Sequence, residues 1–423
     1  MKINKDQIKK LIKENLKSGI TVACVSIPLS IAIAIASGGT PQAGIITGFW
    51  ATIIAAILGG SKFNVVGPAG ALTSVLFAAT VSPEIGIPVN IILPILAIFS
   101  GIIIFIVYVL GLDKYVKLIP EVVVHGFAGG VAFVIASTQL AQAFGIANTF
   151  KATGEFLEDI HSLIINLPKL NIATFLCFLF FFSFLLWWKK NIKAVPGVIP
   201  ATFMGVIFGF FSKSFDFTST ILTVGDKYGE LKLSLINFFN LADFSLVFSS
   251  GTIFFAVLKV AGVVALISIL ETLITAKIGD SLTGTNFNAK KETFGLAISN
   301  IFSGFMGGLP STGVFIRTGL NIKSGATHNT SAIICGLLTG LGAVFLMPLF
   351  KFVPMSVIAA MLMMTAIGLI DVSHFKHLFK HSRFEFAVGM ITILLVIVAD
   401  PAIAVCVGIA LYFLGKEKFA KHA

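Results

Sequence analysis

The sequence predicts an all-α membrane protein whose helices cross the bilayer many times. Only 12% of the residues are charged, 57% are hydrophobic and the mean hydropathy is +1.00, whereas about a quarter of the residues of a soluble domain are charged. Apolar runs long enough to span a bilayer recur along the chain, for example at 20–37, 91–110 and 122–141.

These runs predict about fourteen spans. In chain order, we expect them at 18–37, 43–59, 64–80, 91–111, 120–143, 172–188, 196–211, 252–276, 292–308, 309–322, 328–349, 354–370, 384–398 and 401–415.

The net charge of +11 follows the expected topology and does not require a nucleic-acid partner. Basic residues gather in the lysine-rich start, 1–17, and in short connections such as 189–193 and 376–383. If the N-terminus is cytoplasmic, these connections all lie inside, as the positive-inside rule requires. We therefore expect a protein of the inner (plasma) membrane with both termini in the cytoplasm.

The longest connection, 212–251, divides the chain into two halves and is expected outside the cytoplasm. The first transmembrane repeat is predicted at 18–211 and the second at 252–415, followed by a short cytoplasmic tail, 416–423. Each half has an odd number of expected spans, so the second enters from the opposite side and the repeat is inverted. Residues 1–17 have apolar side chains at helical spacing among lysines, which predicts an amphipathic helix on the inner membrane surface.

Two short segments, one in each half, share a proline followed by small residues. Residues 66–73 read Val-Gly-Pro-Ala-Gly-Ala-Leu-Thr, and 309–314 read Leu-Pro-Ser-Thr-Gly-Val. Either segment alone could be an ordinary kinked helix, but corresponding interrupted spans in two halves indicate the midplane site of a transporter. Because helix N-termini carry unpaired N–H groups and partial positive charge, we expect two half-helices to meet N-terminus to N-terminus around a small anion.

The residues at these two helix starts are predicted to bind the anion. Arg317 is expected to supply a fixed positive charge, since a charge at that depth is costly and marks a functional site. Ser26 and Ser30, in the kinked first span, are expected to line the cavity. The expected backbone N–H donors are those of Ala69, Gly70, Ala71, Ser311, Thr312 and Gly313.

Glu271 lies within the expected span 252–276 and is the predicted coupling residue. An unpaired carboxylate at that depth must pair, take up a proton or hold a cation. In one interpretation Glu271 takes H⁺ or Na⁺ beside the anion, with Thr275 as a further oxygen ligand of Na⁺. In the other, Glu271 forms an ion pair with Arg317. Apart from such a Na⁺ ion, no cofactor is expected.

Five stretches taken together resemble the SulP (sulfate permease) family of anion transporters, and the resemblance covers residues 18 to about 415. The stretches are Ala-Cys-Val-Ser-Ile-Pro-Leu-Ser at 23–30, Val-Gly-Pro-Ala at 66–69, Val-His-Gly-Phe at 124–127, Glu-Thr-Phe-Gly-Leu-Ala-Ile-Ser-Asn-Ile at 292–301 and Gly-Leu-Pro-Ser-Thr at 308–312, continuing to Arg317-Thr318.

The resemblance implies a core domain that carries the anion and a gate domain at the interface of a homodimer. Transport would be an elevator-like movement of one domain against the other, with the anion between spans three and ten. Ile316 precedes Arg317 where many sulfate-type members have serine, and the tenth span is closer to bicarbonate-type bacterial members. Most members continue into a cytoplasmic STAS domain, whereas this sequence ends at Ala423. Either the protein is a naturally short member or the sequence was cut there, and no STAS domain is expected in residues 1–423.

The leading hypothesis is therefore secondary active transport of a small inorganic anion, bicarbonate or sulfate, coupled to Na⁺ or H⁺. One alternative is an uncoupled chloride/bicarbonate exchanger or channel. Another is a nucleobase permease of the same fold, although a neutral base would not need Arg317. An enzyme is not expected, because the sequence shows no metal-ligand cluster and no pair of nucleophile and base.

Overall fold

The structure, a computed structural model, describes residues 5–112, 120–147, 153, 155–192, 195–214, 221–236, 238–399 and 401–419. The outermost residues of the expected N-terminal helix and of the expected tail lie outside this part of the chain. Among the described residues, eight helices are long and apolar enough to cross a membrane, and three shorter apolar helices accompany them. The chain is a multi-span membrane protein.

Helices dominate the described residues, with two very short strands and two turns of 3₁₀ helix (η). In chain order the elements are α1 (Lys5–Ala36), α2 (Pro41–Leu58), β1 (Val66–Gly67), α3 (Gly70–Val81), α4 (Val89–Val109), α6 (Glu121–Ala143), α7 (Phe156–Asn166), η1 (Leu167–Lys169), α8 (Ile172–Asn191), α9 (Val198–Ser214), α10 (Val224–Tyr228), η2 (Leu241–Asp243), α11 (Phe244–Phe248), α12 (Gly251–Thr283), α13 (Ala289–Phe305), β2 (Thr312–Gly313), α14 (Phe315–Lys323), α15 (Thr330–Phe350), α16 (Met355–Leu369), α17 (Val372–His381), α18 (Arg383–Val398) and α19 (Pro401–Phe419).

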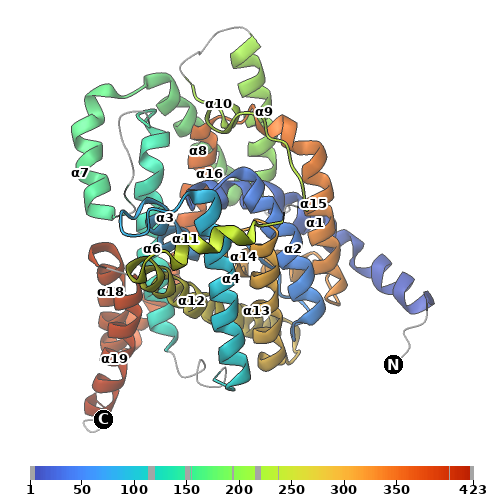
Figure 1. The fold of residues 1–423 in the computed structure, drawn as a ribbon, viewed down its shortest axis with the longest axis vertical. Coiled ribbons are helices and arrows are strands. Elements are labelled where there is room, and N and C mark those ends of the chain that lie inside the picture. Colours follow the sequence, from blue (N-terminus) through green and yellow to red (C-terminus); the bar gives the residue numbers. More distant parts are fainter. Residues whose placement is uncertain are drawn as a thin grey trace.

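The helices lie where the apolar runs predict them, and local signals explain several of their ends. Thr40 begins α2 by accepting a hydrogen bond from Ala43 N at 3.3 Å, with Pro41 as the first helical residue. Gly284 ends α12 in the left-handed conformation that glycine tolerates best. The helix that contains the first expected span is longer than predicted, because α1 includes the N-terminal segment from Lys5 onward without a break (Figure 1).

Two helices of intermediate length, α7 and α17, were not expected from the sequence. Both have one apolar and one polar face, with acidic residues in the first turn of α7 and basic residues in the last turn of α17. A search for continuous apolar runs overlooks such helices, because their apolar residues are spaced for one face only.

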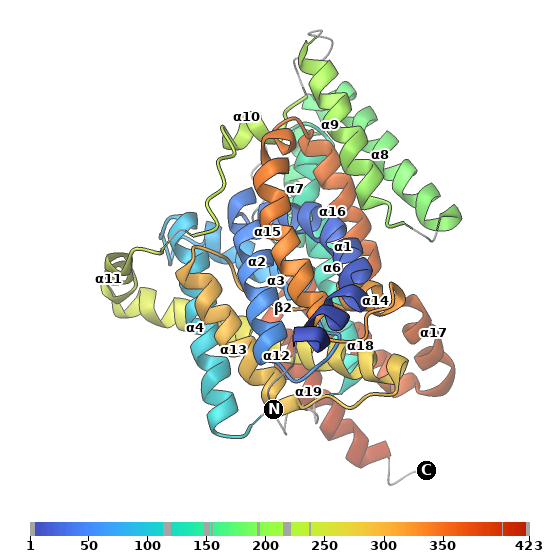
Figure 2. The ribbon, with the colours of Figure 1, turned by 90° about the vertical axis from the view of Figure 1, so that its right-hand side faces the viewer.

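The helices pack in two groups. In the first group α13 lies against α2 and α4, α1 lies against α2 and α15, and α3, α12 and α14 complete it. In the second group α6 lies against α16 and α18, with α8, α9 and α19 around them. The groups meet where α6 touches α3 and where α1 touches α9 and α16 (Figures 1 and 2). This division corresponds to the core and gate domains that the resemblance implies.

A two-stranded antiparallel ladder lies at the centre of the first group. It pairs Val66 with Gly313 and Gly67 with Thr312. Each strand leads into a short helix, β1 into α3 and β2 into α14. Because the strands run in opposite directions, the N-termini of α3 and α14 face one another across the ladder, which is the arrangement that the sequence predicts.

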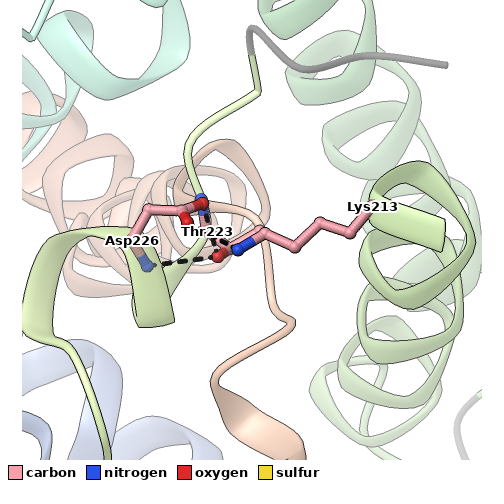
Figure 3. Close-up of polar contacts among 3 residues, drawn as sticks. All are labelled: Lys213, Thr223 and Asp226. Carbon is pink, nitrogen blue, oxygen red and sulfur yellow. Dashed lines mark hydrogen bonds and ion pairs between the residues drawn. The ribbon is translucent and has the colours of Figure 1, made fainter. Parts of the chain in front are cut away.

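The connection between α9 and α12 is tied to α9 by a polar contact at the start of α10 (Figure 3). Thr223 and Asp226 form a capping box, in which each side chain accepts a hydrogen bond from the other residue's backbone N–H. Lys213, at the end of α9, donates to the Asp226 carboxylate. Burial raises the pKa of Asp226, but the hydrogen bonds from Lys213 and Thr223 together outweigh it and hold the pKa below its usual value.

Candidate anion-binding site

Arg317 lies in the first turn of α14 with its guanidinium in the middle of the first helix group. The side chain is completely buried. Its Nη2 donates to Ser30 Oγ of α1 at 3.1 Å, while Nε and Nη1 have no hydrogen-bond partner among the described residues. A buried guanidinium with unpartnered N–H groups is costly unless an acceptor fills the place beside it.

Glycine at position 67 makes room for this guanidinium. A Cβ atom built on Gly67 would lie 2.3 Å from Arg317 Nη1, far inside van der Waals contact. The carbonyl of Val66, the neighbour of Gly67 in β1, accepts a hydrogen bond from Thr52 Oγ1 of α2 at 2.5 Å, which fixes the strand. Backbone and guanidinium therefore approach closely because residue 67 has no side chain.

The structure corrects the predicted donors on the β2 side. Ser311 N donates to Asn300 Oδ1 at 2.8 Å, and Gly313 N donates to Thr272 Oγ1 at 2.8 Å. Thr312 pairs with Gly67 in the ladder. The sequence could not reveal this, because the acceptors come from α12 and α13.

The open N–H groups at α14 lie further along the chain than predicted. The first helical hydrogen bond of α14 is donated by Thr318 N to Val314 O at 2.9 Å, so the N–H groups of residues 315–317 have no partner within the helix. In this first turn Phe315 and Ile316 are 49% and 41% exposed, whereas Arg317 is completely buried.

The donors predicted on the α3 side keep their position. Ala69 is the N-cap residue of α3, and Leu72 N makes the first hydrogen bond, to Ala69 O at 3.3 Å. The N–H groups of Gly70 and Ala71 therefore precede the hydrogen-bonded part of the helix. All three residues are buried in the first helix group.

Glu271 on α12 faces a small cavity between the two helix groups. The cavity has a volume of about 60 Å³, and Ala71 of α3 also lines it. Its other lining side chains are apolar and come from α6, α12, α16 and α19. Glu271 Oε2 has no hydrogen-bond partner in the described part of the chain. The carboxylate is thus placed at the seam between the groups.

Glu271 and Arg317 do not form the ion pair that one interpretation of the sequence proposed. Among the described residues, neither Arg317 nor Glu271 lies within 4 Å of an oppositely charged side chain. The two charges face different surroundings, Arg317 the interior of the first group and Glu271 the seam.

Of the remaining predicted site residues, one contacts the Arg317 side chain and two do not. Ser30 accepts from Arg317, whereas Ser26 contacts Cys335 Sγ of α15 at 3.6 Å. Thr275 Oγ1 donates to Gly313 O at 3.2 Å, so this hydroxyl supports β2. Ser30 alone of the two serines therefore touches the charged group.

The buried carboxylate of Glu292, which was not predicted as a site residue, holds the loop before β1. Glu292, on α13, accepts from Gly60 N at 2.7 Å, Ser61 N at 2.8 Å and Asn64 Nδ2 at 2.7 Å. Asn64 in turn accepts from Thr318 Oγ1 at 3.0 Å. In the sequence Glu292 was noted only as part of the stretch 292–301. Its role as an acceptor could not be predicted, because its partners lie more than two hundred residues away.

Comparisons with known proteins agree with this architecture. A model of the Sulfate permease family matches residues 12–392. YvdB of Bacillus subtilis, whose name assigns it provisionally to sulfate transport, is 28% identical over 409 residues, which are 95% of this chain and 73% of that protein. The bicarbonate transporter BicA of Picosynechococcus sp. is 26% identical over 409 residues, covering 94% of this chain and 69% of BicA.

Solved structures share the fold. The transmembrane domain of a cyanobacterium bicarbonate transporter BicA superposes with a TM-score of 0.79 at 24% identity, covering 93% of this chain and 97% of that one. The murine Slc26a9 anion transporter in the inward-facing state gives a TM-score of 0.81 at 16% identity, covering 96% and 68%. Since the family model matches most of its length, the chain belongs to the sulfate permease family, a family of membrane anion transporters.

Proposed function

We propose that this protein is a secondary active transporter for a small inorganic oxyanion of the sulfate or bicarbonate class. The observation that carries the proposal is the fully buried Arg317, which lies beside two opposed helix N-termini and whose Nε and Nη1 lack partners among the described residues. An oxyanion supplies the acceptors that these N–H groups need and the negative charge that both helix ends favour. The names of YvdB and BicA support the substrate class.

A nucleobase permease is the less favoured reading of the same fold. A neutral base would leave the positive charge of Arg317 buried without a counter-charge, which is costly in a membrane interior. Competition distinguishes the two: excess uracil should leave anion uptake unchanged, whereas unlabelled substrate anion should abolish uptake of the label.

Coupling is proposed at Glu271, with H⁺ favoured over Na⁺. A hard cation needs several oxygen ligands, but every other side chain that lines the cavity is apolar. The nearby Thr275 hydroxyl is already used for Gly313 O. A proton needs no further ligand and removes the cost of a charge in an apolar cavity.

The proposed movement is a slide of the first helix group against the second. Glu271 and Ala71 of the first group form one wall of the cavity, and residues such as Val124 and Leu369 of the second group form the other. A slide along this seam would carry Arg317 and both helix starts together. Assembly as a homodimer, a plasma-membrane location and cytoplasmic termini belong to the same proposal.

The anion site is tested by uptake of radiolabelled sulfate and bicarbonate into proteoliposomes. We expect Arg317→Ala to abolish uptake and Arg317→Lys to restore it weakly, because lysine keeps the charge without the planar fork. Lys323→Ala, an exposed residue at the other end of α14, is the matched control and should transport normally. Unchanged uptake by Arg317→Ala would remove the anion site from this position.

Coupling is tested separately by imposing a pH gradient or a Na⁺ gradient on the same vesicles. The wild type should accumulate anion in response to the pH gradient, and Glu271→Gln should retain exchange of internal for external anion while losing accumulation. Accumulation driven by Na⁺ alone would contradict H⁺ coupling but leave the anion site intact. Turnover without any accumulation by the wild type would favour the uncoupled exchanger or channel.

A further inference from the structure

Helix α17 lies outside the anion site and has one face docked on the second helix group. Phe375 and Leu378 are only 9% and 6% exposed. Phe375 fits against Gly389 of α18, where an added Cβ would lie 2.8 Å from the ring. At the start of the helix Asp371 accepts a hydrogen bond from His374 N at 2.9 Å. The helix is therefore held firmly, and its other face has a defined direction.

The opposite face of α17 carries bases and no acids. Residues 372–384 contain no Asp or Glu, and Lys376, Lys380 and Arg383 are exposed. At about 100° per residue, Lys376 and Lys380 lie opposite the buried pair of Phe375 and Leu378. Asp371, the nearest acid on the N-terminal side, caps the helix start, and Glu385, the nearest on the other side, lies in α18. The exposed face of α17 itself therefore carries bases only.

Two large apolar side chains stand beside this basic row. Val372 and Phe379 are 54% and 60% exposed, and on the helix they lie between the buried face and the lysines. In the interfacial region of a bilayer such residues contact acyl chains, while neighbouring lysines reach the headgroups. The pattern is that of a helix lying in the membrane surface.

The position of α17 in the fold agrees with a location at the membrane surface. The helix connects the end of α16 to the start of α18, which is the expected span 384–398. Figure 2 shows α17 in the lower half of the molecule, the half in which α1 begins and α19 ends. It is therefore on the same side as the lysine-rich N-terminal segment, the side that the positive-inside rule assigns to the cytoplasm.

We propose that the exposed face of α17, formed by Val372, Lys376, Phe379 and Lys380, together with Arg383 at the start of α18, binds the anionic lipid headgroups of that leaflet. Clusters of bases next to the cytoplasmic end of a span attract anionic lipids, and the apolar pair adds contact with their acyl chains. Because α17 packs on α18, headgroup binding there holds the second helix group at a fixed height in the bilayer.

The test places a reporter in the surface itself. Phe379→Trp is introduced into the full chain, and the added fluorescence is measured in two vesicle preparations of identical phosphatidylcholine and phosphatidylglycerol content. In one, all of the phosphatidylglycerol is brominated; in the other, an equal mole fraction of the phosphatidylcholine is brominated. We expect brominated phosphatidylglycerol to quench at least about twofold more strongly, and salt to reduce the difference.

The second part of the experiment removes the positive charges of the surface. Adding Lys376→Gln, Lys380→Gln and Arg383→Gln to the reporter should make the two kinds of brominated lipid equally effective. The matched control removes three lysines at other connections on the same side, Lys62, Lys290 and Lys291, and should keep the preference for phosphatidylglycerol.

Equal quenching in the reporter protein itself would overturn the proposal, as would a preference that survives the triple substitution. Equal quenching with little quenching by either lipid would place the face in water, where a soluble partner could reach it. Fluorescence does not depend on transport, so these outcomes are independent of whether the proposed anion transport is correct.

Discussion

The guanidinium of Arg317 lies directly against the backbone of Gly67, so that a Cβ atom at position 67 would stand 2.3 Å from Nη1. Residue 67 belongs to β1 and residue 317 to α14, the two elements that carry the opposed helix starts. The position of the only buried arginine among the described residues is thus set by the lack of a side chain on the facing strand.

Gly67→Ala should therefore displace the guanidinium and lower anion uptake at least about tenfold, which corresponds to about 1.4 kcal/mol. The control is Gly319→Ala in α14, where no atom among the described residues lies within 4 Å of an added Cβ and the methyl group fits. The measurement is initial uptake by equal amounts of folded protein in proteoliposomes. Equal activity of the two variants would show that the position of Arg317 does not limit transport.

Glu292→Gln should destabilise the protein by about 2–4 kcal/mol, because an amide N–H₂ group would face donors that now have a carboxylate acceptor. The N–H₂ group would oppose either Gly60 N and Ser61 N, which donate to Oε2, or Asn64 Nδ2, which donates to Oε1. The matched change is Glu121→Gln, which breaks an exposed ion pair with Lys277 and should cost no more than about 1 kcal/mol. Thermal unfolding of both variants in the same detergent compares them directly.

Thr272→Val keeps the shape of the side chain but removes the acceptor of Gly313 N. A buried N–H group left without a partner costs about 1–3 kcal/mol, so the variant should unfold at a lower temperature and bind anion less well. Thr392→Val is the control: among the described residues its hydroxyl bonds only to Val388 O, within the same helix, and no N–H group there loses a partner. A similar effect of both substitutions would argue against a special role for the Thr272 hydroxyl.

The contact between Lys213 and Asp226 should be insensitive to pH from neutrality down to about 5, and be lost only in more acidic solution. The pKa of Asp226 is lower in the folded protein than its usual value of about 4. Its contribution to stability is thus fully present above that usual value and disappears as the pH falls through the lower, folded pKa.

Asp226→Asn should remove this acid-dependent part of the stability while leaving the rest of the pH profile in place. The readout is the rate of proteolysis in the connection between α9 and α12 as a function of pH. Asp243→Asn serves as the control, because among the described residues the Asp243 carboxylate makes no hydrogen bond or ion pair. If that variant changed the acid limb as strongly, the effect would not arise from the contact with Lys213.

Much of the fold was predictable because its signals are local. Long apolar runs specify helices, because a backbone in a bilayer must satisfy its own hydrogen bonds. The segments around Pro68 and Pro310 interrupt such runs, and these interruptions are visible in the sequence however the helices pack. Arg317 and Glu271 were identifiable for the same reason, since a charge within an apolar run is costly wherever the run packs.

The sequence by itself thus determined the membrane class, the position of most helices, the two half-helices and the two charged residues within apolar runs. Only the tertiary structure decided which N–H groups remain open, because the partners of Ser311 and Gly313 come from other helices. It also decided that Glu271 and Arg317 face different surroundings, and that Glu292 supports the loop before β1. Hydrogen bonds and ion pairs between distant segments depend on packing in three dimensions, and no local pattern of residues encodes them.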